Sequence, residues 1–268
     1  MSSADRPSNP SIADIKSVTQ PDSILSRANS EHWLNDVYLR KVSPYLTRLF
    51  IARNTAPNTI TFLMIGIGKL AALSLLINGI PGAILAAVLA QFQMVVDCTD
   101  GEVARWQNKF SATGIFLDKV AHYTVEALVP VALGIRAAGG LSSFTAQPTW
   151  WPWLGACVAV LVILNKSLND AVHVSRALNG MEKLQDVRGM SAPHHSLLSS
   201  LRKLTKVIPF HRIFHSIEMT ALALFAAVID QMSGNTAGTQ YLVIGLLVLS
   251  AVTVVGHFLS ILSSSRLK

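Results

Sequence analysis

The sequence predicts an all-α, polytopic membrane protein with six transmembrane helices and an N-terminal cytoplasmic amphipathic helix. Of its 268 residues, 51% are hydrophobic and only 14% are charged, whereas soluble domains carry about 25% charged residues. Apolar runs that are long enough to cross a hydrocarbon layer of roughly 30 Å as helices recur along most of the chain. No alternating strand pattern competes with them, so we expect helices alone.

Two segments precede the first predicted span. Residues 1–30 are rich in Ser, Asp, Asn and Pro and show no apolar stripe at helical spacing, which predicts a disordered cytoplasmic tail. Residues 31–54 carry apolar side chains at helical spacing, from Trp33 to Phe50, with basic side chains facing elsewhere. This pattern predicts an amphipathic helix, bent near Pro44, that lies on an anionic membrane surface.

Residues 55–268 are predicted to form one membrane domain of six helices. The expected spans cover approximately residues 59–77, 83–96, 114–138, 150–168, 213–232 and 241–262. Nearly all basic residues fall in four places: the segment before the first span, the 97–113 connection, the 169–212 loop and the C-terminus. Because basic residues mark cytoplasmic loops, we expect both termini and the 97–113 connection in the cytoplasm.

The net charge of +7 does not indicate nucleic-acid binding. The basic residues lie in particular loops of a chain that is largely embedded in lipid, so they report topology and contact with lipid headgroups. We therefore expect membrane lipids among the partners and no nucleic acid. The expected location is the inner or plasma membrane of the cell.

The stretch from Asp97 to His122 combines charged residues with apolar flanks. Carboxylates at the edge of a hydrocarbon layer are unfavourable unless a positive charge compensates them. Two sets of residues each share one helix face. They are Asp97, Asp100, Gly101 and Ala104 on one helix, and Gly114, Asp118 and His122 on the next. If these faces pack antiparallel, three carboxylates and an imidazole converge, and the small residues leave room for close approach or a flat ligand.

Such an oxygen-rich cluster suits magnesium or manganese better than zinc. Two ions of this kind would clamp a phosphoryl group during transfer between oxygens, and Arg105 would add positive charge for a phosphate. From the spacing alone, a phosphoryl-transfer site is the leading interpretation. A proton or cation pathway is the competing one.

The motif D-x2-D-G-x2-A-R-x8-G-x3-D-x3-H, from Asp97 to His122, resembles the signature of the CDP-alcohol phosphatidyltransferases, which ends in Asp. Seven of its eight fixed positions match. The expected six helices and the Pro57-Asn58-Thr59-Ile60-Thr61 start of the first span add to the resemblance. It implies a membrane transferase of phospholipid biosynthesis, usually a homodimer. Such an enzyme moves a substituted phosphate from a CDP-alcohol, such as CDP-diacylglycerol, to a hydroxyl acceptor and releases CMP.

The resemblance also implies roles for individual residues. Asp97, Asp100 and Asp118 match positions that bind two divalent ions, Mg²⁺ or Mn²⁺. The positions that contact the CDP moiety are Gly101, Ala104, Arg105 and Gly114. The same pocket is expected to include Ser111, Asn58 and Thr61.

His122 stands where the family has an aspartate that acts as general base and touches one metal. An imidazole can accept a proton at neutral pH and can ligate a metal, but it leaves the cluster one negative charge short. Three interpretations stay open. His122 is the base, or it only ligates or packs while the base lies elsewhere, or the chain is an inactive relative that binds a nucleotide-lipid or a partner enzyme.

Basic residues near the cytoplasmic boundary are the candidates for binding the acceptor: Lys166, His173, Arg176 and Arg212. In the functional interpretation they hold an anionic acceptor, such as a phosphorylated polyol. In the alternative they are ordinary juxtamembrane charges that extend to the lipid headgroups.

Overall fold

A computed structural model describes residues 6–22, 35–146, 148–182, 184 and 213–267. Every element in these ranges is a helix, which confirms the all-α prediction for the part of the chain that the structure describes. The chain divides into two compact units, Met1–Leu70 with Val88–Thr124, and Ala71–Ala87 with Val125–Lys268.

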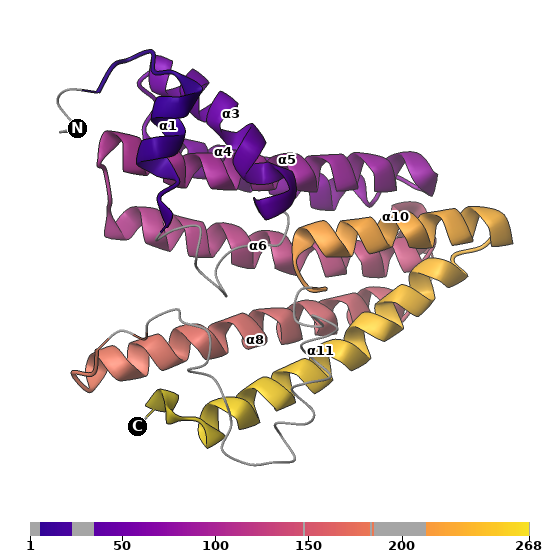
Figure 1. The fold of residues 1–268 in the computed structure, drawn as a ribbon. Helices are drawn as coiled ribbons and strands as arrows, with labels where there is room; N and C mark the ends of the chain where they lie inside the picture. Colours follow the sequence, from indigo (N-terminus) through magenta and orange to yellow (C-terminus); the bar gives the residue numbers. More distant parts are fainter. Residues whose placement is uncertain (1–5, 23–34, 147, 183, 185–212, 268) are drawn as a thin grey trace. The chain divides into compact units, whose positions relative to one another are not determined.

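The first unit contains three elements of its own and parts of three long helices (Figure 1). Its own elements are α1 (Ile12–Thr19), the π-helical η2 (Asn35–Leu39) and α3 (Arg40–Ala52). The long helices are α4 (Pro57–Ser74), α5 (Gly79–Gln107) and α6 (Ala112–Ala137). The core of this unit joins Ile15 of α1 to Ile60 of α4 and to Val103 and Trp106 of α5.

Helix α1 corrects, for residues 12–19, the disordered tail that we expected over residues 1–30; residues 1–5 and 23–30 lie outside the described residues. Ser11 accepts a hydrogen bond from the Asp14 backbone, and the Asp14 side chain accepts one from the Ser11 backbone, which together form a capping box. The hydrogen bond from the Ser11 side chain also lowers the pKa of Asp14 below its ordinary value. Ile15 is completely buried, so helix capping and one apolar anchor order a segment whose composition suggests a coil.

Helix α3 covers the second half of the predicted amphipathic helix and contains Pro44. Val42, Tyr45 and Leu49 are exposed on its outer side, while Ser43 and Thr47 are buried. The helix is therefore two-sided, but its inner face is partly polar. Its placement on a membrane surface stays a prediction.

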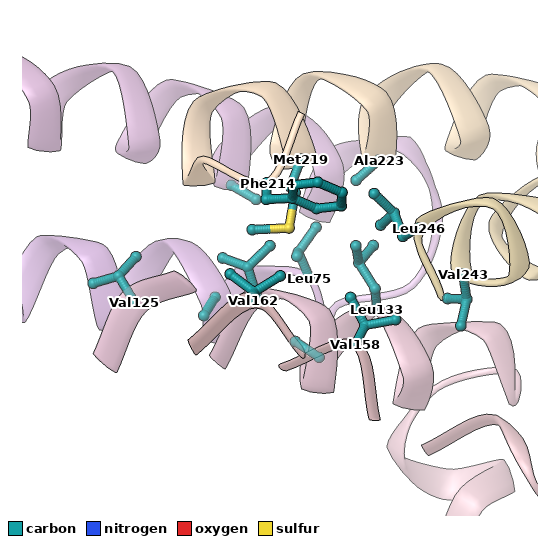
Figure 2. Close-up of a cluster of buried hydrophobic side chains, with 14 of the residues drawn as sticks. Leu75, Val125, Leu133, Val158, Val162, Phe214, Met219, Ala223, Val243 and Leu246 are labelled. Carbon is teal, nitrogen blue, oxygen red and sulfur yellow. The ribbon is translucent and has the colours of Figure 1, made fainter. Parts of the chain in front are cut away.

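The second unit contains α7 (Leu141–Ala146), α8 (Trp151–Leu178), α10 (Ser216–Ser233), α11 (Ala237–Ser263) and the short η4 (Ser265–Leu267). Helix α11 packs along α8 and α10. Figure 2 shows Phe214, Met219 and Val162 pointing toward one another in the apolar core of this unit. Helix α8 continues past the predicted end of the fourth span at residue 168 and ends at Leu178, about three turns further on.

Two glycines allow α6 and α8 to pack closely. A Cβ atom at Gly155 would lie 2.4 Å from the Pro130 carbonyl oxygen, and one at Gly134 would lie 2.6 Å from the Trp151 carbonyl oxygen. Both distances are shorter than a Cβ atom tolerates, so only glycine fits. Small residues at such crossings are typical of helices that associate within membranes.

Four of the described helices, α5, α8, α10 and α11, are long and apolar enough to cross a membrane. Together with the family evidence given below, they support an integral membrane protein. The two remaining predicted spans are also helical, as α4 and α6. That these two cross the membrane, and hence the total of six spans, stays a prediction.

Candidate active site

Helices α5 and α6 bring two carboxylates and an imidazole together in the first unit. The His122 Nε2 atom lies 3.3 Å from Asp97 Oδ1 and 3.5 Å from Asp118 Oδ1. One candidate ligand atom from each of these residues lies within 4.8 Å of the other two. The side chains are 25%, 20% and 44% exposed for His122, Asp97 and Asp118, so the cluster is open to small ligands.

Asp100 lies one helical turn beyond Asp97 on α5, and its carboxylate contacts a residue of α4. The Thr61 hydroxyl donates a hydrogen bond to Asp100 Oδ2 at 2.8 Å. Asp100 is close enough to Asp97 and Asp118 for their negative charges to act on it. Three carboxylates thus face one region, where a hard cation would offset their mutual repulsion.

Arg105 lies over Gly101, one turn earlier on α5. A Cβ atom at Gly101 would lie 3.2 Å from Arg105 Nη1 and 3.4 Å from Nη2. The bare backbone at Gly101 therefore gives the guanidinium room to lie flat against the helix. This arrangement places a fixed positive charge on the helix that also carries Asp97 and Asp100.

Asn58, Ser111 and Gly114 meet where α4 and α6 begin. The Gly114 N–H donates to Ser111 Oγ at 3.0 Å, so Ser111 caps the first turn of α6. A Cβ atom at Gly114 would lie 3.2 Å from Asn58 Oδ1 and 3.3 Å from Ser111 Oγ. The structure thus brings Asn58 next to Ser111 and Gly114, which lie far from it in the sequence and which we had assigned to the same pocket.

The connection from α5 to α6 is short and turns at Asn108. This residue adopts a positive φ of 50°, and the Lys109 N–H donates to the Ala104 carbonyl at 2.9 Å, which ends α5. Asparagine tolerates the left-handed conformation better than most residues. The turn returns the chain so that Asp118 and His122 meet Asp97.

The candidate acceptor residues on α8 belong to the second unit. Lys166 Nζ lies 2.7 Å from Oε2 of the buried Glu126, and His215 Nδ1 lies 3.4 Å from its Oε1. Arg176 donates to the backbone carbonyls of Glu182 and Arg266. His173 is exposed, and Arg212 lies outside the described residues.

Sequence reasoning missed Glu102, which is completely buried on α5. Its carboxylate accepts hydrogen bonds from Ser43 Oγ at 2.7 Å, Thr47 Oγ1 at 2.5 Å and Gln20 Nε2 at 2.8 Å. These donors come from α3 and from the residue after α1, so one charge joins three elements. The spacing of Ser43 and Thr47 on one face of α3 was the available signal.

Comparison with known families settles the class of protein. The family model for CDP-alcohol phosphatidyltransferase matches residues 54–208, which is more than half of the chain. The chain therefore belongs to the CDP-alcohol phosphatidyltransferase family. Its members are membrane transferases of phospholipid biosynthesis that move a phosphatidyl group from a CDP-alcohol and use divalent metals. No curated protein matches the chain.

Proposed function

We propose that this protein transfers a phosphatidyl-type group from a CDP-alcohol, such as CDP-diacylglycerol, to a hydroxyl acceptor and releases CMP. The observation that carries the proposal is the convergence of Asp97, Asp118 and His122 within 4.8 Å in a chain of this family. Both carboxylates and the imidazole occupy the motif that resembles the family signature.

The donor set fits two divalent ions, magnesium or manganese, because hard cations prefer carboxylate oxygens. Asp97, Asp100 and Asp118 would hold them, and His122 would be a further ligand only in the alternative in which the base lies elsewhere. When bound, the ions supply positive charge beside the oxygens of the transferred phosphate. Thr61 keeps Asp100 oriented through its 2.8 Å hydrogen bond.

The CDP moiety is assigned to the surface beside the carboxylates. Gly101, Ala104 and Gly114 leave space for it, and Arg105 pairs with its phosphates because a guanidinium forms paired hydrogen bonds to phosphate oxygens. Asn58, Thr61 and Ser111 complete the pocket. This assignment is supported by the closeness of Asn58 and Ser111 to Gly114.

His122 is assigned as the general base. Its Nε2 takes the proton of the acceptor hydroxyl while the acceptor oxygen bonds to phosphorus and the bond from phosphorus to the CMP oxygen breaks. CMP leaves with the electron pair of that bond. Asp97 and Asp118, at 3.3 Å and 3.5 Å from Nε2, stabilise the imidazolium that forms.

The acceptor is assigned to the basic residues Lys166, His173, Arg176 and Arg212, which suit an anionic alcohol. Six spans would place the active site and both termini on the cytoplasmic side of the inner or plasma membrane. We further propose a homodimer, as the family resemblance implies.

The test is metal-dependent release of CMP. The purified chain in detergent is mixed with CDP-diacylglycerol, Mn²⁺ and, one at a time, glycerol phosphate, inositol phosphate and serine. CMP release that requires both an acceptor and the metal supports the proposal. No turnover with any acceptor, together with retained binding of CDP, would support an inactive nucleotide-lipid-binding relative instead. We keep this alternative because His122 stands where the family has an aspartate.

A further inference from the structure

The segment before the family match, residues 6–20, contacts α5 at the turn that carries Arg105. The Arg105 Nε donates a hydrogen bond to the Thr19 carbonyl oxygen at 2.6 Å. Thr19 is the last residue of α1, where carbonyl oxygens have no partner within the helix and the helix dipole favours a cation. The end of α1 is therefore a suitable acceptor for a guanidinium.

Two further contacts hold this segment in place. Arg6 donates to the backbone carbonyls of Arg105, at 2.8 Å, and of Trp106, and its guanidinium lies 5.7 Å from the centre of the Trp106 ring. Gln20 donates to Glu102 at 2.8 Å and to the Arg40 carbonyl at 3.0 Å. With Ile15 completely buried, the segment is anchored at both ends and in the middle.

These contacts limit the conformations of Arg105. With Nε bonded to Thr19, the terminal nitrogens Nη1 and Nη2 lie over Gly101. A long side chain loses rotamer freedom when it binds a ligand, and holding it beforehand removes part of that loss. An arginine also forms a rigid planar fork that a lysine cannot copy.

We propose that α1 is part of the donor site and acts as a positioning element. The Thr19 carbonyl holds the Arg105 guanidinium over Gly101, in the orientation in which it meets the phosphates of the CDP-alcohol. The inference rests on the proposed function, because it assigns a donor contact to Arg105. The family match begins at residue 54, so α1 lies outside the part of the chain that the family model covers.

The experiment uses the full chain in detergent and measures the Kd of CDP in the presence of Mn²⁺. Ile15→Asp puts a charge into the apolar contact and detaches α1, which hydrogen exchange of residues 12–19 verifies. We expect the Kd to rise about two- to tenfold, because this is the loss of affinity expected when one immobilised side chain becomes mobile. Arg6→Ala removes an independent anchor and should shift the Kd in the same direction. Ala13→Asp, an equal charge on the exposed side of α1, should leave it unchanged.

A double-mutant cycle with Arg105→Met separates positioning from a general structural role. Methionine has no hydrogen-bond donor for Thr19 and no charge for a phosphate, so I15D should have no further effect in the R105M background. An equal loss in both backgrounds, or an unchanged Kd once α1 is shown to be detached, would overturn the inference. If the unmodified chain does not bind CDP at all, the proposed function itself fails, and the inference fails with it.

Discussion

Nε2 of His122 on α6 lies 3.3 Å from Oδ1 of Asp97 on α5. Positions 97 and 122 are separated by an entire helix-to-helix connection, yet their side chains share one site. The histidine therefore takes part in the carboxylate cluster, although the family resemblance leads one to expect an aspartate there. This contact makes His122 the first residue to test.

Changing His122 to Ala should reduce CMP release by a factor of about 100 or more, because general bases typically contribute 10²–10⁴-fold to a rate. Changing it to Asp should retain a large part of the activity, since a carboxylate can accept the same proton. Initial rates of CMP release at saturating Mn²⁺ measure both effects. Full activity of the alanine variant would eliminate the assignment of His122 as base.

Asp97→Asn should weaken Mn²⁺ binding by at least about tenfold, because even residues that only support a metal ligand typically contribute 10–100-fold. Asp22→Asn, which neutralises an exposed carboxylate in the N-terminal segment, is the matched control and should not change binding. Isothermal titration of Mn²⁺ into the metal-free protein gives the two affinities. Equal affinities for the Asp97 variant and the unmodified chain would contradict the proposed ligand set.

Thr61→Val removes the hydroxyl that donates to Asp100 while keeping the shape of the side chain. A hydrogen bond to a charged group contributes about 1.5–3 kcal/mol, so the Mn²⁺ concentration for half-maximal activity should rise roughly tenfold or more. Thr59→Val alters an exposed threonine two positions earlier and should have no such effect. The Mn²⁺ concentration for half-maximal activity is read from the Mn²⁺ dependence of CMP release for both variants. Identical curves for the two variants would refute a role for Thr61.

Glu102→Gln replaces a completely buried carboxylate by an amide. One of its oxygens becomes an NH₂ group that faces hydroxyl donors, and a mismatched buried polar group costs about 1–3 kcal/mol. We expect a lower thermal unfolding temperature and faster hydrogen exchange in α1 and α3. Glu182→Gln, at an exposed position, serves as the control. Unchanged exchange in both helices would show that Glu102 does not hold them.

Lys166→Met leaves the buried Glu126 without its closest cation and should destabilise the protein by about 3 kcal/mol, at the lower end of the range for breaking buried ion pairs. The double variant K166M/E126Q should regain most of this stability, because neither charge is then left alone. Thermal unfolding in detergent provides the comparison, with Lys41→Met as the control for an exposed lysine.

The same double variant tests the acceptor assignment of Lys166. If Lys166 contacts an anionic acceptor, the stable double variant should still show a raised KM for the acceptor and an unchanged KM for the CDP-alcohol. Normal acceptor kinetics would instead identify the Lys166–Glu126 pair as purely structural.

Features that depend on neighbouring residues in the chain could be predicted from the sequence. The apolar runs predicted helices that the structure contains, and the i, i+3 and i+4 spacing placed Asp97 with Asp100, and Asp118 with His122, on single helix faces. Helix α1 was a local error within the described residues, because the Ser11 and Asp14 capping signal was overlooked in a segment of polar composition.

The sequence by itself thus determined the class of fold, the family and the residues of the motif, because hydropathy and helical periodicity are local properties. Only the tertiary structure decided that Thr61 reaches Asp100, that Glu102 joins α1 and α3 to α5, and that Thr19 holds Arg105. These contacts link residues 39 to 86 positions apart. Their partners are selected by the packing of whole helices, for which a single sequence carries no local signal.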